Sequence, residues 1–237
     1  MSHRLIPAVC VSAGLAVISG CTPTINAANV TTEGAEATTS SADAANTTYG
    51  LIGKWMIDPD GQPARWLGYQ LNDHNLREPV NVILVDKVAK TPQEAASRLV
   101  SAMQAAGYGP KGGHSVGYKG LILGQMYGQQ PGGKDEAFSD GAWWQSNNHG
   151  RVFGPAPIDS GGYLWTAAFS REDFELISSM HHPYNSFKVA RDDLSAKLSA
   201  AGTFKRLDTL KLDNALNTPT LTTDDHDGGA AVLVAEK

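Results

Sequence analysis

The chain has 237 residues, of which 41% are hydrophobic and 18% charged, so it is long and apolar enough to bury one sizeable core. This composition excludes collagen-like, coiled-coil and wholly disordered proteins. Nineteen Lys and Arg against 24 Asp and Glu give a net charge of −5 without a basic run, so nucleic acid is not an expected partner.

Residues 1–20 have the features of an export signal. Arg4 precedes an apolar stretch, 5–18, that is too short to span a bilayer as a permanent helix. The stretch ends in Ile-Ser-Gly-Cys at 18–21, which resembles the lipobox of bacterial lipoproteins. The resemblance implies that Cys21 carries a diacylglycerol, with palmitate-like chains, and becomes the first mature residue. An ordinary secretory signal that happens to contain this cysteine is the alternative.

A lipidated Cys21 would hold the protein at a membrane, because each buried CH₂ contributes roughly 0.8 kcal/mol. We therefore expect a lipid-anchored protein of the cell membrane or outer membrane, facing the periplasm or the exterior. The other cysteine, Cys10, lies inside the signal. The mature chain then has no disulfide, no cysteine nucleophile and no thiolate metal site.

Three further segments follow the signal. Residues 21–48 hold the lipidated cysteine and a Thr- and Ala-rich stretch with too few large side chains to fold, so they predict a disordered tether. Residues 49–216 form the predicted globular domain. Residues 217–237 are rich in Thr, Asp and Gly and predict a flexible acidic tail, despite a closing Ala-Val-Leu-Val.

The first clear elements of the domain are a turn, a strand and a helix. Asp-Pro-Asp-Gly at 58–61 is typical of a turn. The run Val-Asn-Val-Ile-Leu-Val at 80–85 predicts a central strand. Thr91, Pro92 and Glu94 then supply the N-cap, the N1 proline and the capping-box acid of a helix that ends at Gly107 and packs on this strand.

A second helix is predicted over 187–201, with Ser186 as its N-cap and Gly202 after its end. Between the helices, the pattern predicts strands at 118–123, 151–153 and 163–169. The fold class that follows is α+β: a single compact domain with a mixed sheet and about two packed helices.

Residues 113–117, Gly-His-Ser-Val-Gly, match the nucleophile elbow of serine hydrolases. That elbow requires a buried strand leading to the serine and a helix leaving it. Here the approach, 107–112, is rich in Gly, Pro and Lys, and the exit predicts a strand, so a Gly-rich hairpin entry is favoured over a nucleophilic Ser115. A triad could be completed in the usual order with Asp140, Asp159 or Asp173 and His181 or His182.

Six histidines of the mature chain could supply ligands or acid–base groups: His74, His114, His149, His181, His182 and His226. Several stand among amides or acids in predicted loops, where functional residues concentrate. The chain has no His-Glu-x-x-His, and for each histidine we favour a structural hydrogen-bonding role. The sequence thus predicts no metal site and no cofactor.

Five landmarks over residues 66–203 resemble, in order, the C-terminal domain of LssY proteins: Glu78–Asn81, Ala105–Tyr108, His149–Phe153, Trp165–Phe169 and Ala190–Leu194. That domain accompanies phosphatidic-acid-phosphatase-like or membrane segments in several bacteria, so the resemblance implies an envelope context but no catalytic residues. The chain departs from the family in its lipid anchor and in Asn147-Asn148, where members tend to be basic.

His149 and Arg151, two residues apart, share one face of a predicted strand. His181, His182, Asn185 and Arg191 enter the second helix. If these groups converge, they suit a phosphate or carboxylate. Otherwise Arg191 pairs with Glu172, Asp192 or Asp193, and the histidines cap loops.

The sequence therefore favours a non-catalytic envelope lipoprotein whose domain binds an anionic small molecule or a protein partner. The alternative is an envelope hydrolase that uses Ser115 or a histidine site built on His74, His149 or His181.

Overall fold

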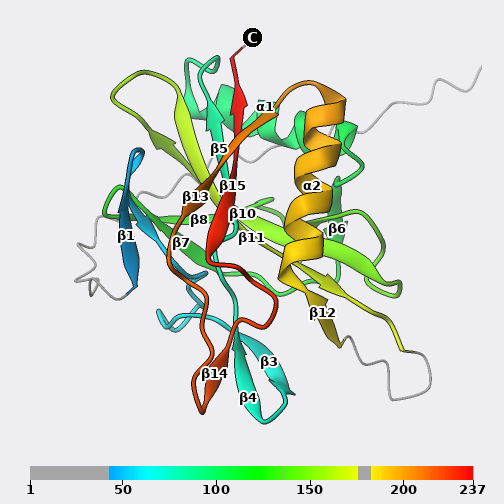
Figure 1. Cartoon of the computed structure of the whole chain (residues 1–237). Helices are drawn as coiled ribbons and strands as arrows, with labels where there is room; N and C mark the ends of the chain where they lie inside the picture. The colour runs from blue at the N-terminus through cyan, green and yellow to red at the C-terminus, as the bar shows by residue number, and fades with distance from the viewer. Residues whose placement is uncertain (1–42, 135, 176–182, 237) are drawn as a thin grey trace, which may run out of the picture.

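A computed structural model describes residues 43–134, 136–175 and 183–236 (Figure 1). These residues form two helices, α1 (Pro92–Ala105) and α2 (Phe187–Ala201), and fifteen strands. The strands are β1 (Ala44–Thr47), β2 (Gly50–Gly53), β3 (Arg65–Leu71), β4 (His74–Arg77), β5 (Val82–Asp86), β6 (Pro110–Gly112), β7 (Lys119–Ile122), β8 (Gln125–Gln130), β9 (Glu136–Ser139), β10 (Asn147–Pro157), β11 (Tyr163–Glu172), β12 (Tyr184–Ser186), β13 (Lys205–Lys211), β14 (Leu221–Thr222) and β15 (Gly229–Ala235).

Twelve of these strands belong to one sheet, whose main path runs β1-β2-β7-β8-β10-β11-β5-β15-β13. Most neighbours are antiparallel, but β15 runs parallel to β5, with Ala231 opposite Val82. The sheet is therefore mixed, and the expected α+β domain with two helices is confirmed. A smaller sheet, β14-β4-β3, lies at one end of the molecule (Figure 1).

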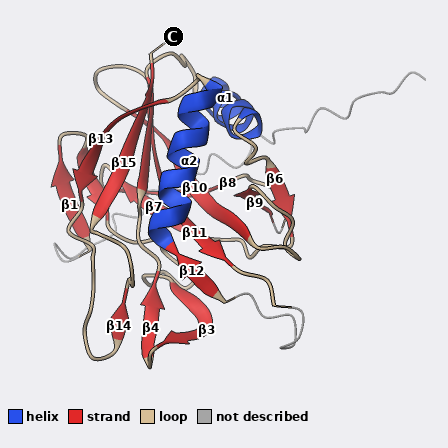
Figure 2. Cartoon of the chain, turned by 45° about the vertical axis from the view of Figure 1, so that its right-hand side comes forward, coloured by secondary structure: helices blue, strands red, loops and turns tan. Residues whose placement is uncertain are grey.

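Both helices pack on one face of the main sheet (Figure 2). All five residues of β5 are buried, and alternate side chains enter different cores. Val82 and Leu84 join the cluster beneath α1 and α2, whereas Ile83 and Val85 join the cluster on the opposite face, with β2 and β7. A strand buried on both sides explains the nearly continuous apolar run in the sequence.

The helix boundaries follow the predicted caps. Thr91 Oγ1 accepts a hydrogen bond from Glu94 N at 3.1 Å, and Pro92 occupies the first turn of α1. Ser186 Oγ accepts from Val189 N at 2.8 Å at the start of α2. Gly202, with φ +87°, closes this helix in the left-handed conformation.

The prediction of a flexible acidic tail at 217–237 is wrong. β15 lies between β5 and β13 in the main sheet, and all seven of its residues are buried. The acidic residues before it have specific partners: Asp225 Oδ1 accepts from Phe187 N at the start of α2 at 3.0 Å, and Asp227 binds Arg191. Local composition does not indicate that this segment is part of the sheet, because its partners are distant in sequence.

The predicted start of the domain at residue 49 also needs correction. Ala44–Thr47 forms β1, which pairs with β2, and Asp43 Oδ1 accepts from Trp55 Nε1 at 3.0 Å. The signal, Cys21 and the tether up to residue 42 lie outside the described residues.

Candidate functional site

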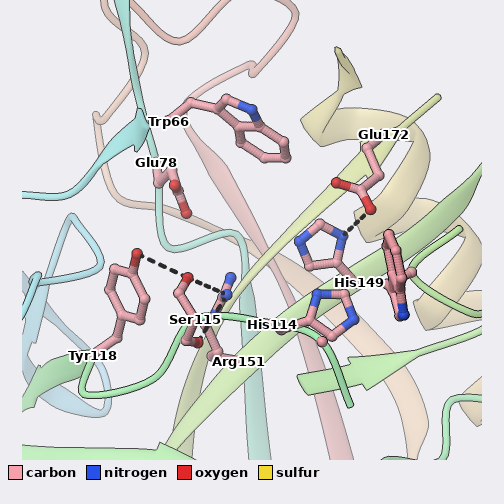
Figure 3. Close-up of a pocket in the computed structure, with 10 residues that line it drawn as sticks. Trp66, Glu78, His114, Ser115, Tyr118, His149, Arg151 and Glu172 are labelled. Atoms are coloured by element: carbon pink, nitrogen blue, oxygen red, sulfur yellow. Dashed lines mark hydrogen bonds and ion pairs between the residues drawn. The ribbon is translucent and has the colours of Figure 1, made fainter. Parts of the chain in front are cut away.

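A cavity of about 300 Å³ lies where β10 meets the small sheet (Figure 3). We call it the Arg151 pocket. Its lining residues come from six separate parts of the chain: Trp66, Glu78, Gly113, His114, Ser115, Tyr118, Trp143, His149, Arg151 and Glu172.

The strand β10 supplies His149 and Arg151. Their two-residue spacing puts both side chains on the same face, and both line the pocket, as the sequence predicts. Antiparallel pairing places β10 between β8 or β9 on one side and β11 on the other, so the backbone beneath these two residues is fixed.

Arg151 carries a buried positive charge that no carboxylate neutralises by an ion pair within the described residues. Its side chain is 7% exposed. One terminal nitrogen donates to the backbone oxygen and to Oγ of Ser115, both at 3.1 Å, and the guanidinium lies 4.7 Å from the ring centroid of Tyr118. Nε, also buried, has no hydrogen-bond partner within this part of the chain. A buried guanidinium in this state favours an incoming anion.

Two stacked imidazoles lie beside this charge. The ring centroids of His114 and His149 are 4.8 Å apart. His149 Nδ1 is 3.8 Å from Glu172 Oε1, and that oxygen accepts a hydrogen bond from Asn147 Nδ2 at 2.9 Å. Glu172 is thus held in place beside the imidazole of His149.

Glu78 closes another wall of the pocket. Burial raises the pKa of this carboxyl to about 7, and the nearby Arg151 partly opposes the rise. Near neutral pH, Glu78 is therefore partly protonated. In that form it is a hydrogen-bond donor and does not repel an anion.

The Gly-His-Ser-Val-Gly segment contributes to the pocket but does not form a nucleophile elbow. Strand β7 follows Ser115 where the elbow needs a helix, as expected. The hydrogen-bond partners of Ser115 Oγ are Tyr118 OH at 3.2 Å and Arg151. Gly113, at φ +91°, lies so close to Trp143 that a Cβ there would be 2.6 Å from the indole.

The other predicted ligand residues that the structure describes, Asn185 and Arg191, do not line this pocket. Arg191 is buried in α2 and donates to Asp227 at 2.6 Å and to Asp192 at 3.0 Å. Its hydrogen bonds hold the pKa of Asp227 at about 2. The predicted convergence of Arg191 with Arg151 is therefore wrong. The alternative of a carboxylate partner holds for Asp192, whereas the partner Asp227 was not predicted.

Asn185 donates to Asp173 Oδ2 at 2.7 Å, and His74 begins β4 away from the pocket lining. His181 and His182 lie outside the described residues.

Sequence reasoning missed Trp66, Glu78, Tyr118, Trp143 and Glu172 as site residues. Each comes from a different element or loop, so no spacing in the chain indicates their convergence. Among the residues that the structure describes, no group of three His, Cys, Asp or Glu is placed to hold a metal ion, and no helix is long and apolar enough to cross a membrane.

Comparisons with protein-family models, with curated proteins and with solved structures found no match in any of the three. The resemblance to LssY C-terminal domains therefore stays a prediction.

Proposed function

We propose that this protein is a lipid-anchored envelope lipoprotein whose domain binds a small molecule through an anionic group, without altering it chemically. The observation that carries the proposal is the buried Arg151 guanidinium, which faces a cavity and has no carboxylate of the described residues in ion-pair contact. The lipobox at Cys21 supports the envelope location.

The surroundings of Arg151 fit an anion better than a cation. The stacked His114 and His149 add positive charge when protonated. The carboxyl of Glu78, whose pKa is about 7, is mainly neutral when the pH is below that value. Trp66 and Trp143 give the pocket apolar walls, which is typical of small-molecule sites with a few oriented polar groups.

The experiment is a thermal-unfolding series on the mature chain in detergent, followed by tryptophan fluorescence, with and without phosphate or glycerol 3-phosphate. Either ligand should raise the melting temperature more at pH 5.5 than at pH 8, since imidazoles lose their proton near pH 6.5. Arg151→Lys should reduce this effect because a point charge cannot replace the planar fork.

The matched control is Arg206→Lys, which changes an exposed arginine outside the pocket. It should leave the ligand-dependent shift intact. If neither ligand raises the melting temperature of the wild-type protein at either pH, the binding proposal is wrong.

A second candidate function, an envelope hydrolase, has one observation in its favour. The Asn147, Glu172 and His149 chain resembles the arrangement that orients a histidine base. Turnover of a phosphate or carboxylate ester that disappears in His149→Gln would favour it over simple binding.

A further inference from the structure

A second cavity, of about 810 Å³, adjoins the Arg151 pocket. We call it the Arg77 cavity. Trp66, Ser115 and Tyr118 line both cavities, so the two lie side by side at these three residues. The strands β3 and β4 supply Arg65, Gln70, Asn75 and Arg77 to the second cavity.

Arg77 is a second buried guanidinium without an ion-pair partner among the described residues. Its side chain is 9% exposed, and its buried Nε has no hydrogen-bond partner there. The guanidinium lies 5.3 Å from the ring centroid of Trp55, a contact that supports it by the cation–π attraction but does not satisfy Nε.

A like charge stands directly opposite. Arg65 pairs with Arg77 across β3 and β4. Burial and the nearby Arg65 lower the pKa of Arg77, and the carboxylate of Asp43 partly opposes this fall. Like charges directly opposite in a sheet destabilise it. An anion held between the two guanidiniums would reduce this repulsion and could accept a hydrogen bond from Arg77 Nε.

Two consecutive residues supply different charges to the two cavities. Arg77 lines the second cavity and Glu78 the first. Two acids share the second cavity, Asp58 and Asp60. Asp58 is engaged by its own turn, where Oδ1 accepts from Asp60 N and Gln62 N, and Asp60 is exposed to solvent.

We propose that the two cavities form one cleft for a ligand with two anionic groups, one held by Arg151 and the other by Arg77 and Arg65. This inference rests on the proposed function. The hydroxyl of Ser115, the amides of Gln70 and Asn75 and the rings between the two sites suit a hydroxylated spacer. The ligand class is therefore a sugar that carries two phosphates or two carboxylates.

The test measures binding by isothermal titration calorimetry to the mature chain in detergent, with probes matched in pairs. Fructose 1,6-bisphosphate is compared with fructose 6-phosphate, and digalacturonate with galacturonate. The first pair tests phosphates as the anionic groups of the ligand, and the second pair tests carboxylates. In at least one pair, the doubly charged probe should bind about tenfold more tightly, since it gains charge-assisted hydrogen bonds at the second site.

Arg77→Gln should remove this advantage and leave the affinity for the singly charged probe unchanged, whereas Arg77→Lys should keep part of it. Because Arg77 packs on Trp55, the exposed Arg65→Gln serves as the second variant if Arg77→Gln does not fold, and it should reduce the same advantage. Arg206→Gln is the control and should change neither affinity.

Two results would overturn the inference, and they are distinguishable. If singly and doubly charged probes bind the wild-type protein equally and Arg151→Gln abolishes both, the second site is wrong but the proposed function stands. If no probe binds, both are wrong.

Discussion

Glu78→Gln should make the protein more stable at alkaline pH. Burial raises the pKa of this carboxyl from 4.5 to about 7 in the folded chain. The folded state therefore keeps its proton between these two values while the unfolded chain loses it. The stabilising effect of this proton is complete below pH 4.5 and is lost as pH rises through 7.

The size of the effect follows from the same two values. The gap between 4.5 and about 7 corresponds to roughly 3 kcal/mol at pH 8 and above. Urea unfolding at pH 5 and pH 8.5, followed by tryptophan fluorescence, measures it for the wild type, Glu78→Gln and the control Glu136→Gln on β9.

The difference in unfolding free energy between Glu78→Gln and the wild type should increase by roughly 2.5 kcal/mol from pH 5 to pH 8.5, since a small part of the effect is already lost at pH 5. The control should parallel the wild type. If the unfolding free energy of Glu78→Gln follows the same pH dependence as that of the wild type, burial does not keep this carboxyl protonated. The explanation of how the pocket accommodates an acid beside an anion would then be wrong too.

Four other outcomes are expected. Cys21→Ser should release the protein from membranes in a high-salt fractionation, and unchanged retention would contradict the lipid anchor. A fluorophosphonate should not label Ser115, so stoichiometric labelling that disappears in Ser115→Ala would prove this wrong. His226 is buried against Asn214, and burial lowers its pKa to about 4, so acidification from pH 6.5 to 4 should cost up to roughly 3 kcal/mol in urea unfolding, a loss that His226→Gln should lack. Deleting residues 217–237 removes β15, so circular dichroism should show no cooperative thermal transition; a sharp transition would contradict the central role of that strand.

Local signals in the sequence were sufficient to predict the helices and the best-buried strand. The caps Thr91 and Ser186 act within three residues of themselves, so short windows contain the whole interaction. The alternation that places His149 and Arg151 on one face is also a property of two residues. These predictions are confirmed.

The rest depends on partners far apart in the chain. β15 has the aliphatic run typical of a buried strand, but its acidic and Gly-rich approach suggested a tail. The pocket likewise combines Trp66, Glu78 and Glu172 with β10, and no spacing encodes that encounter. Arg191 was predicted to join the pocket, but it binds Asp227, which lies in the segment that composition predicted to be a flexible tail.

The parallel pairing of β5 with β15 also has a kinetic consequence. Val82 pairs with Ala231, and most of the folded chain lies between them in the sequence. Closing a loop of that length costs on the order of 4 kcal/mol of chain entropy before the strand contacts can stabilise it. Such a high contact order predicts slow folding, on the scale of milliseconds to seconds. Until β15 docks, the edge of β5 and the apolar face that Ala231 and Leu233 share with the helices stay open to other chains. The folding intermediate, rather than the native protein, is therefore where we expect aggregation to begin.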